Sequence, residues 1–384
     1  MLPMRDLHLW LQRREPHSLR LLKQLVEIES PTYDKAAVDR MGRAVAAEWR
    51  RRAARVRTVP NRERGAHVRA EFTPAQQDKS AGGQILVLGH LDTVYPLGTL
   101  GKMPFRIVRG RAYGPGTFDM KGGHVIALCA VDALHALKIF PLRKIVFLWT
   151  SDEEIGSQTS RRLIESEARR SKAVFVLEPA FGADGRLKTQ RKGVGEAELI
   201  VTGRSAHAGI APETGVNAVH ELALQIGRLL KWNNAKRGIT VQANVIDGGT
   251  ASNVVAANAR ALIDVRVARA SDSRLLNRKL HALRPFLSGA KIKVAGGINR
   301  PPMERTTSSA LFSQAQKLTR EMGVQLGEAS TGGGSDGNFT AALGIPTLDG
   351  LGAVGDGAHS PSENILISAL AERAALLAGL LASI

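Results

Sequence analysis

The sequence predicts an α/β fold in which a domain built on a mostly parallel sheet is interrupted by an inserted α+β domain. Two features lead to this prediction. Short apolar runs alternate with helical stretches in the first half of the chain, which is the pattern of parallel strands with crossover helices. Between about residues 190 and 300 the strands instead alternate apolar and polar residues, as half-exposed strands do. A length of 384 residues is sufficient for two domains.

Helices and buried strands are predicted to alternate in the first part of the chain. Residues 16–29 and 34–54 have helical periodicity. Four short apolar runs are predicted to be buried strands, at residues 84–89, 144–150, 173–177 and 345–348. Helices are expected between the first three of these strands, at about residues 119–137 and 156–169. This βαβαβ order indicates a mostly parallel sheet.

The middle of the chain is predicted to form the inserted domain. Three strands are expected on an antiparallel sheet, at residues 196–202, 239–246 and 259–267, with helices at about 216–231 and 271–286. We therefore place the first domain at residues 1–190 and 301–384, and the insert at 191–300. The glycines at 193–195 and 296–297 are expected to act as hinges.

The composition excludes several classes of protein. A content of 43% hydrophobic and 23% charged residues is ordinary for a globular chain and excludes disorder, collagen and coiled coil. There is no apolar run of about 18 residues, so no transmembrane helix is expected. The charged N-terminus does not resemble a signal peptide, and the single cysteine, Cys129, excludes a disulfide framework or a thiolate metal cage. We therefore predict a cytoplasmic protein.

The net charge of +18 favours an acidic partner, which could be nucleic acid, an anionic membrane surface or an anionic substrate. The basic residues form two clusters, at 50–57 and 161–172, beside helical patterns. Such clusters are typical of solvated helix faces, and no basic motif interleaved with aromatic residues is present. We expect neither nucleic acid nor membrane as a partner.

Side chains that can bind metal follow each of the first three predicted strands. His90 and Asp92 follow the first strand, Glu153 and Glu154 follow the second, and Glu178 follows the third. Ligands of open parallel sheets collect at the carboxyl ends of the strands, so these residues are expected to converge. Two further candidates are Asp119, which begins a helix after a glycine-rich turn, and His359, which lies after the last strand.

Each of these residues alone also has an ordinary structural explanation. Asp119 could be a helix N-cap, Glu153 and Glu154 could be solvated residues at a helix start, and His90 could be a core histidine. Their convergence at one sheet edge favours a metal site. Imidazole and carboxylate without thiolate is the ligand set of a hydrolytic zinc site, or of cobalt or manganese. One of the two glutamates could then bind metal while the other accepts a proton from water, and Asp92 could orient the His90 ring.

In this order, five segments resemble the di-zinc exopeptidase and deacylase family, which includes carboxypeptidase G, aminoacylase-1 and succinyl-diaminopimelate desuccinylase. They read GHLDTV, GPGTFDMKGG, SDEEIGS, LEPA and GAHSPSE, and the likeness extends to VTGRSAHAG in the insert and to TGGGSD at 331–336. The likeness is greatest to the glutamate carboxypeptidase branch. This likeness implies a glutamate-type carboxypeptidase that releases a C-terminal amino acid, although the stretch at 185–193, near where that branch contacts the glutamate side chain, is not matched.

The resemblance implies a role for each candidate in the first domain. Asp119 would bridge two zinc ions and precede a cis peptide bond to Met120. His90 and Glu178 would complete one metal site, and Glu154 and His359 the other. Glu153 would be the general base and Asp92 would orient the ring of His90. The chemistry implied is two-metal hydrolysis of an amide.

The resemblance also assigns roles to the insert, as a lid and dimerisation domain. His207 and Asn253 would bind the developing oxyanion and the substrate, while Arg266 and Arg300 would hold its carboxylate. Arginine suits that role because its planar fork pairs with a carboxylate through two hydrogen bonds. The glycines at 332–334, including Gly333 and Gly334, would let main-chain N–H groups approach the same carboxylate. The alternative is that these are a surface histidine, a turn asparagine, two ordinary arginines and a flexible loop.

Three functions remain open at this point. The first is a carboxypeptidase acting on peptides or N-acyl glutamates, and the second is an N-acyl amino acid deacylase with the same chemistry. The third is a catalytically silent, basic binding protein, which should have lost some ligands, whereas all candidates are present. For the enzyme we expect a substrate with a free carboxylate and a homodimer, because pairing two inserts would cover an exposed sheet edge. The resemblance implies that His207 then enters the partner's site. The alternative is a monomer whose lid brings His207 to its own metals.

Overall fold

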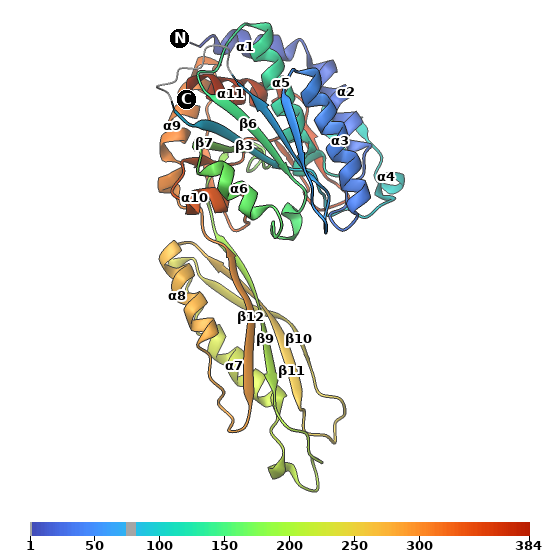
Figure 1. The fold of residues 1–384 in the computed structure, drawn as a ribbon, viewed down its shortest axis with the longest axis vertical. Helices are drawn as coiled ribbons and strands as arrows, with labels where there is room; N and C mark the ends of the chain where they lie inside the picture. Colours follow the sequence, from blue (N-terminus) through green and yellow to red (C-terminus); the bar gives the residue numbers. More distant parts are fainter. Residues whose placement is uncertain (1, 74–81) are drawn as a thin grey trace. The chain divides into compact units, whose positions relative to one another are not determined.

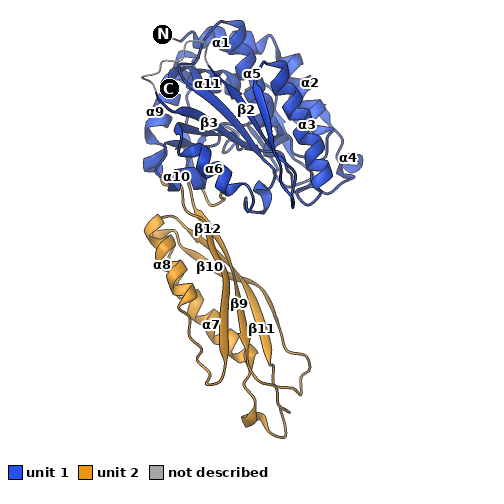
Figure 2. Ribbon diagram, viewed as in Figure 1, with its two compact units in different colours: residues 1–190, 305–330, 335–384 blue, residues 191–304, 331–334 orange. Residues whose placement is uncertain are grey.

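The computed structural model describes residues 2–73 and 82–384, which form two compact units (Figures 1 and 2). Unit 1 consists of the described residues within Met1–Gln190, Arg305–Ser330 and Ser335–Ile384. Unit 2 consists of Arg191–Glu304 and Thr331–Gly334. Residues 301–304 and 331–334, which the sequence placed in the first domain, thus belong to unit 2.

Unit 1 is built on a six-stranded sheet in the order β1-β2-β6-β3-β7-β14. The pairs β6–β3, β3–β7 and β7–β14 are parallel, so the predicted α/β fold is confirmed. The sequence analysis did not predict β1 and β2, which add an antiparallel hairpin beside β6. The strands are β1 (Arg55–Val59), β2 (His67–Phe72), β3 (Gln84–His90), β6 (Lys144–Thr150), β7 (Ser171–Val176) and β14 (Thr347–Leu348).

Helices cover both faces of this sheet, because its central strands are apolar on both sides. Ile85 and Val87 of β3 pack into the larger core with α1, α2, α3, α5, α9 and α11, while Leu86 and Leu88 face α6 and α10. The helices of unit 1 are α1 (Met4–Gln12), α2 (Glu15–Val26), α3 (Lys35–Arg51), α4 (Thr99–Lys102), α5 (Gly122–Ala136), α6 (Arg161–Ala168), α9 (Ser309–Glu321), α10 (Gly337–Ala342) and α11 (Ala369–Ser383). Within the described ranges, no helix has the length and apolar character needed to cross a membrane.

Besides the main sheet of each unit, the described residues form two small sheets. The first, in the order β15-β16-β5-β4, joins segments that are far apart in the sequence. Its strands are β4 (Arg106–Val108), β5 (Arg111–Tyr113), β15 (Gly355–Asp356) and β16 (Asn364–Leu366). The second pairs β8 (Leu187–Arg191) with β13 (Glu328–Thr331).

Unit 2 is a four-stranded antiparallel sheet in the order β10-β11-β9-β12 with two helices (Figure 2). Its elements are β9 (Gly193–Thr202), α7 (Ala218–Leu230), β10 (Thr240–Gly248), β11 (Asn258–Val267), α8 (Ala270–His281) and β12 (Lys291–Arg300). The expectation of three strands was wrong, because residues 291–300 form the fourth. The glycines expected to be hinges lie inside β9 and β12, where Gly195 is paired with Ile298 and Gly296 with Ala197.

Candidate metal centre

The register of the parallel strands brings three of the predicted segments together. His90, the last residue of β3, lies opposite Thr150, the last residue of β6, so Glu153 follows only three residues beyond it. On the other side, Leu88 of β3 lies opposite Val176 of β7. Glu178 therefore comes level with the end of β3. The convergence expected from the strand ends is what this register produces.

Asp119 is presented by a tight turn between β5 and α5. Gly116 in this turn has φ +73°, and a Cβ there would lie 2.9 Å from Thr93 Cγ2, so both the conformation and the space favour glycine. Asp119 itself has non-helical dihedral angles (φ −117°, ψ 92°), and the Asp119–Met120 peptide bond is cis, as the resemblance implied. Gly123 lets the start of α5 approach the backbone just after β7, since a Cβ at this position would lie 2.6 Å from Leu177 O.

His359 reaches the site from the C-terminal part of the chain. It lies in the hairpin loop between β15 and β16, and β16 pairs with β5 through Asn364 and Tyr113. Because β5 leads directly into the Asp119 turn, this pairing sets the His359 loop beside Asp119. The backbone of His359 adopts φ +62°, which is uncommon for a residue other than glycine.

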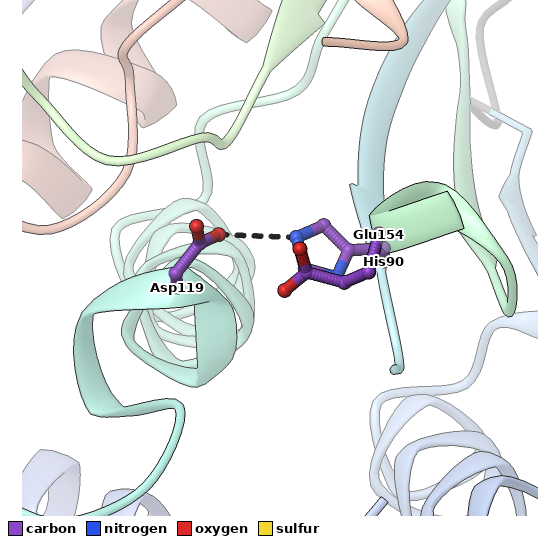
Figure 3. Close-up of side chains that lie close together, drawn as sticks. All are labelled: His90, Asp119 and Glu154. Carbon is purple, nitrogen blue, oxygen red and sulfur yellow. Dashed lines mark hydrogen bonds and ion pairs between the residues drawn. The ribbon is translucent and has the colours of Figure 1, made fainter. Parts of the chain in front are cut away.

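Asp119 lies between the two histidines and faces each with a different oxygen. Its Oδ1 is 3.1 Å from His90 Nε2, and its Oδ2 is 3.3 Å from His359 Nε2. Glu178 Oε1 is 3.6 Å from His90 Nε2, whereas Glu154 Oε2 is 3.3 Å from His359 Nε2. Figure 3 shows Asp119 turned towards His90, with Glu154 close to both. The five predicted ligands therefore form one cluster around Asp119.

Glu153 and Asp92 complete this group of side chains. The carboxylate of Glu153 is buried, and its oxygens, His90 and Glu178 offer ligand atoms within 4.8 Å of one another. The ring Nδ1–H of His90 donates to the main-chain oxygen of Asp92 at 2.9 Å, which leaves Nε2 facing Asp119. The Asp92 carboxylate lies farther from this ring, at 3.5 Å, and accepts from the main-chain N–H groups of Glu153 and Glu154 at 3.3 Å. The expected orientation of His90 by Asp92 thus comes mainly from the backbone of Asp92.

The carboxylates and histidines of the cluster perturb one another strongly. Burial lowers the pKa of His90, but hydrogen bonds to Asp119 and Asp92 outweigh burial and leave this pKa well above 6.5. Hydrogen bonds to Asp119 and Glu154 raise the pKa of His359 to about 10. Burial, with the charges of Asp119 and Glu153, raises the pKa of Glu154 to about 7, although a hydrogen bond from His359 opposes this shift. The cluster thus carries an excess of negative charge that attracts cations.

The donor set fits divalent metal ions. Four carboxylates converge with two imidazoles, and such a concentration of negative charge in a largely buried site requires compensation by cations. Among the residues that the structure describes, Glu154 Oε1 is buried and accepts no hydrogen bond, so it has an oxygen lone pair left to bind a cation. Asp119, with one oxygen towards each histidine, has the arrangement of a bridging ligand.

The remaining candidates belong to unit 2 and form two separate groups. In the first group, Arg266 on β11 and Arg300 on β12 both lie opposite Val194 of β9, on either side of it. Arg266 is bound to its neighbour Asp264, with Nη2 2.8 Å from Oδ2. Arg300 is buried. The two arginines thus lie in one row at the end of the sheet where β9 begins.

The loop at 331–334 packs against this row. Arg191 Nη1 donates to the carbonyl oxygens of Gly333 and Gly334, each at 3.2 Å. A Cβ at Gly334 would lie 3.2 Å from Arg300 Cδ, so the backbone runs close to that side chain. The N–H group of Gly333 points to Thr331 Oγ1 at 3.4 Å. The carbonyl groups of this loop, which the sequence analysis had not considered, therefore have defined partners.

The second group contains His207 and Asn253, beyond the other end of β9 and β11. The ladder of these strands continues past Thr202, since His207 lies opposite Val254 and Ala208 N–H donates to Asn253 O at 2.9 Å. Gly209 N–H donates to His207 Nδ1 at 3.2 Å, so Nδ1 is the acceptor nitrogen and Nε2 carries the proton. His207 is exposed and therefore offers an N–H donor at the surface of unit 2.

Sequence reasoning missed residues that hold the cluster from behind. Glu363 accepts hydrogen bonds from main-chain N–H groups of the Asp119 turn, and Tyr95 donates to the same carboxylate. Thr32 Oγ1 donates to Asp92 Oδ2 at 2.9 Å. A signal was available for Glu363, since it is an acidic residue only four positions after His359 and just before the apolar run of β16. Nothing in the sequence pattern singled out Thr32 or Tyr95.

The chain was compared with known families and proteins. Residues 86–383 match the family described as peptidase family M20/M25/M40. Carboxypeptidase G2 of Pseudomonas sp. is 32% identical over 373 residues, which cover 96% of this chain and 89% of that protein. Succinyl-diaminopimelate desuccinylase of Dechloromonas aromatica is 30% identical over 323 residues, covering 75% of this chain and 80% of that protein.

A solved structure with a similar fold is that of the aminopeptidase PepT from Bacillus cereus. Its TM-score is 0.75 with 20% sequence identity, and the match covers 96% of this chain and 98% of that one. At this level of identity the likeness concerns the fold.

Proposed function

This chain belongs to peptidase family M20/M25/M40, and on that premise we propose that it is a di-zinc hydrolase cleaving an amide whose amine portion is a free amino acid. Membership makes it a metal-dependent hydrolase of the peptidase type. The observation that carries the proposal is the position of Asp119, which presents Oδ1 to His90 and Oδ2 to His359. A carboxylate that faces two histidines with different oxygens suits a ligand shared by a pair of metal ions.

We assign His90, Asp119 and Glu178 to one zinc ion, and Glu154, His359 and the same Asp119 to the other. The pairing of Glu178 with His90 and of Glu154 with His359 supports this division. Cobalt or manganese would be accepted by the same donors. When bound, the two ions lower the pKa of water and polarise the amide carbonyl of the substrate.

Glu153 is the general base in this proposal. Its carboxylate is buried beside His90 and Glu178, while Glu154 lies beside His90 and Asp119 and pairs with His359. Glu153 would accept the proton of the attacking water and deliver it to the leaving nitrogen. The main-chain N–H groups of Glu153 and Glu154 point to the Asp92 carboxylate, so this residue holds the turn that carries both glutamates as well as the ring of His90.

Arg300 and Arg266, with the loop at Gly333 and Gly334, would bind the α-carboxylate of the released amino acid. Arg300 is buried in the row that lies against this loop, where a charge pair is protected from water. The first candidate is a carboxypeptidase, in line with the name of the relative of 32% identity. The second is an N-acyl amino acid deacylase, favoured by the likeness to a desuccinylase.

The two groups of unit 2 support a site shared between two copies of the chain. Arg300 lies opposite Val194, whereas His207 lies beyond Thr202, at the other end of β9. Eight residue steps of strand separate Val194 from Thr202, which is ~26 Å. One small substrate cannot touch both ends of one unit 2. If Arg300 and His207 both contact it, they come from different copies, and Nε2–H of His207 would donate to the developing oxyanion.

A hydrolysis screen tests the proposed function. Peptides, N-acyl glutamates and other N-acyl amino acids are incubated with the protein and zinc, cobalt or manganese, and the release of free amino acid is measured. We expect release that stops with a chelator and returns when metal is added. Release of C-terminal amino acids from peptides favours the carboxypeptidase, and release from acyl amino acids alone favours the deacylase. No hydrolysis of any member with any of the three metals would contradict the proposal.

A further inference from the structure

Glu363 is a fully buried carboxylate directly behind the metal cluster. Its Oε1 accepts from the main-chain N–H groups of Phe118 and Asp119, both at 2.8 Å. Its Oε2 accepts from Gly116 N–H at 3.1 Å and from the phenol of Tyr95 at 2.5 Å. One side chain therefore satisfies three main-chain donors of the turn that presents Asp119.

These donors have little alternative within the turn. Asp119 has non-helical dihedral angles and Gly116 is left-handed, so the turn does not satisfy its N–H groups as a regular helix would. A buried N–H group without a partner is costly, and an ionised carboxylate makes the stronger kind of hydrogen bond to it. The three hydrogen bonds to Glu363 thus stabilise this geometry of the turn over others.

The same carboxylate connects three segments that carry ligands. Glu363 follows His359 by four residues in the loop that ends at β16. Tyr95, which follows His90 and Asp92, donates to Glu363 and also to Ser360 O at 2.9 Å. The segment after β3, the Asp119 turn and the His359 loop therefore meet at Glu363 and Tyr95.

We propose that Glu363, assisted by Tyr95, is a positioning residue that sets the distance between Asp119 and His359 and thereby the affinity for the second metal ion. This inference rests on the proposed metal centre. Neither side chain is among the predicted ligands, and each acts through the residues that bind the metal. Removal of an outer partner of this kind typically lowers metal affinity about 10–100-fold.

Titration with Co²⁺ tests this role without any substrate, by following visible absorption and by competition with a chelator. We expect two equivalents to bind to the wild type. Glu363→Ala should weaken the second equivalent about 10–100-fold and change its absorption bands. The affinity of Glu363→Gln for the second equivalent should lie between those of the wild type and Glu363→Ala. The amide oxygen can still accept from Phe118 and Asp119, but the NH₂ group cannot accept from Gly116. Tyr95→Phe, which leaves all three main-chain bonds, should have the smallest effect.

Glu167 provides a matched control. It is also a buried carboxylate of unit 1, and it accepts from Gln84 Nε2 and Arg69 Nε, both at 2.8 Å, away from the cluster. Glu167→Ala should lower the melting temperature and leave both Co²⁺ affinities unchanged. If Glu363→Ala does not fold, the Co²⁺ affinities of Glu363→Gln and Tyr95→Phe test the role instead. The second ion should then bind more weakly to Glu363→Gln than to Tyr95→Phe.

The outcomes separate this inference from the proposed function. If the wild type binds two Co²⁺ ions and the Glu363 variants bind them equally well, the positioning role is wrong while the metal centre stands. If Glu167→Ala weakens the second ion as much as Glu363→Ala does, the effect is general destabilisation and the role is again wrong. If the wild type itself fails to bind two ions, the proposed metal centre fails and this inference falls with it.

Discussion

Mixing His207→Ala with Arg300→Ala should restore activity that neither variant has alone. In the proposed reaction, Arg300 binds the α-carboxylate and His207 the oxyanion of the neighbouring amide, points about one residue (~4 Å) apart. Within one unit 2 these side chains stand at opposite ends of β9, at least ~26 Å apart by eight strand steps. Side-chain movement cannot close that distance, so in the proposed reaction each site would take one of them from the partner.

The expected recovery of activity follows from how the two variants combine into dimers. Loss of an oxyanion donor costs about 10²–10³-fold, and loss of one partner of a buried charge pair costs about 2–5 kcal/mol, so each variant alone should be nearly inactive. Random exchange of equal amounts makes half of the dimers mixed. In a mixed dimer one of the two sites has both side chains, whichever of them crosses between subunits. The mixture should therefore regain about one quarter of the wild-type kcat/KM per mole of protein.

The assay is hydrolysis under subsaturating substrate, with subunit exchange followed by mass spectrometry of differently labelled chains. A mixture of Glu153→Ala and Glu154→Ala is the control, because both residues belong to one turn of unit 1 and no mixed dimer has a complete pair. Exchange without recovery in the first mixture would refute the shared site, and a monomeric mass in solution would remove its basis.

The other predictions concern the metal centre, the substrate and acid stability. Glu153→Ala should keep both metal ions and lose about 10²–10⁴-fold in kcat, whereas Glu154→Ala should lose one metal equivalent, as measured by metal analysis beside kinetics. Amidation of the substrate's α-carboxylate should lower the kcat/KM of the wild type by the equivalent of about 2–5 kcal/mol. Burial raises the pKa of Glu167, but hydrogen bonds from Gln84 and Arg69 outweigh it and leave the pKa below 4.5, so this carboxylate stabilises the fold above that pH and the stabilisation is lost as the pH falls below it. Glu167→Gln should therefore lose less unfolding free energy than the wild type below about pH 4.5, as measured by denaturant titration at several pH values.

Each of these expectations has an outcome that contradicts it. If Glu153→Ala loses metal and Glu154→Ala keeps it, the two glutamates exchange roles. Equal hydrolysis of amidated and free substrates excludes a carboxylate clamp. Parallel pH profiles for the wild type and Glu167→Gln would show that this carboxylate is not depressed in the fold.

The parts of the fold that could be predicted are those in which burial alone decides the structure. Strands β3, β6 and β7 are apolar on both faces, and they appear in the sequence as short apolar runs. Strands β1 and β2 contain arginines, and Arg69 is paired with Glu71 on the same strand and with Glu167 of α6. Similarly, Arg52 was expected on a solvated helix face but is buried between Glu48 and Asp132. The long-range partners among these, Glu167 and Asp132, leave no local pattern.

The residues of the site also divide into those that the sequence pattern predicts and those that it does not. Three candidate ligands, His90, Glu154 and Glu178, come at the ends of parallel strands, so sheet topology together with residue type points to them. Their outer partners, Tyr95 and Glu363, depend on a contact across 268 positions of the chain, which a single sequence does not show. Strand β12 was missed for a local reason, since Gly296 and Gly297 interrupt it and glycine weakens the strand pattern.

The left-handed backbone of His359 sets the backbone preference of one residue against metal binding. Glycine or asparagine would adopt φ +62° at lower backbone cost than histidine does. The imidazole that faces Asp119 and Glu154 would then be lost. A search for more heat-resistant forms of this protein that chose residues by backbone preference alone would therefore remove the side chain proposed to hold the second metal ion.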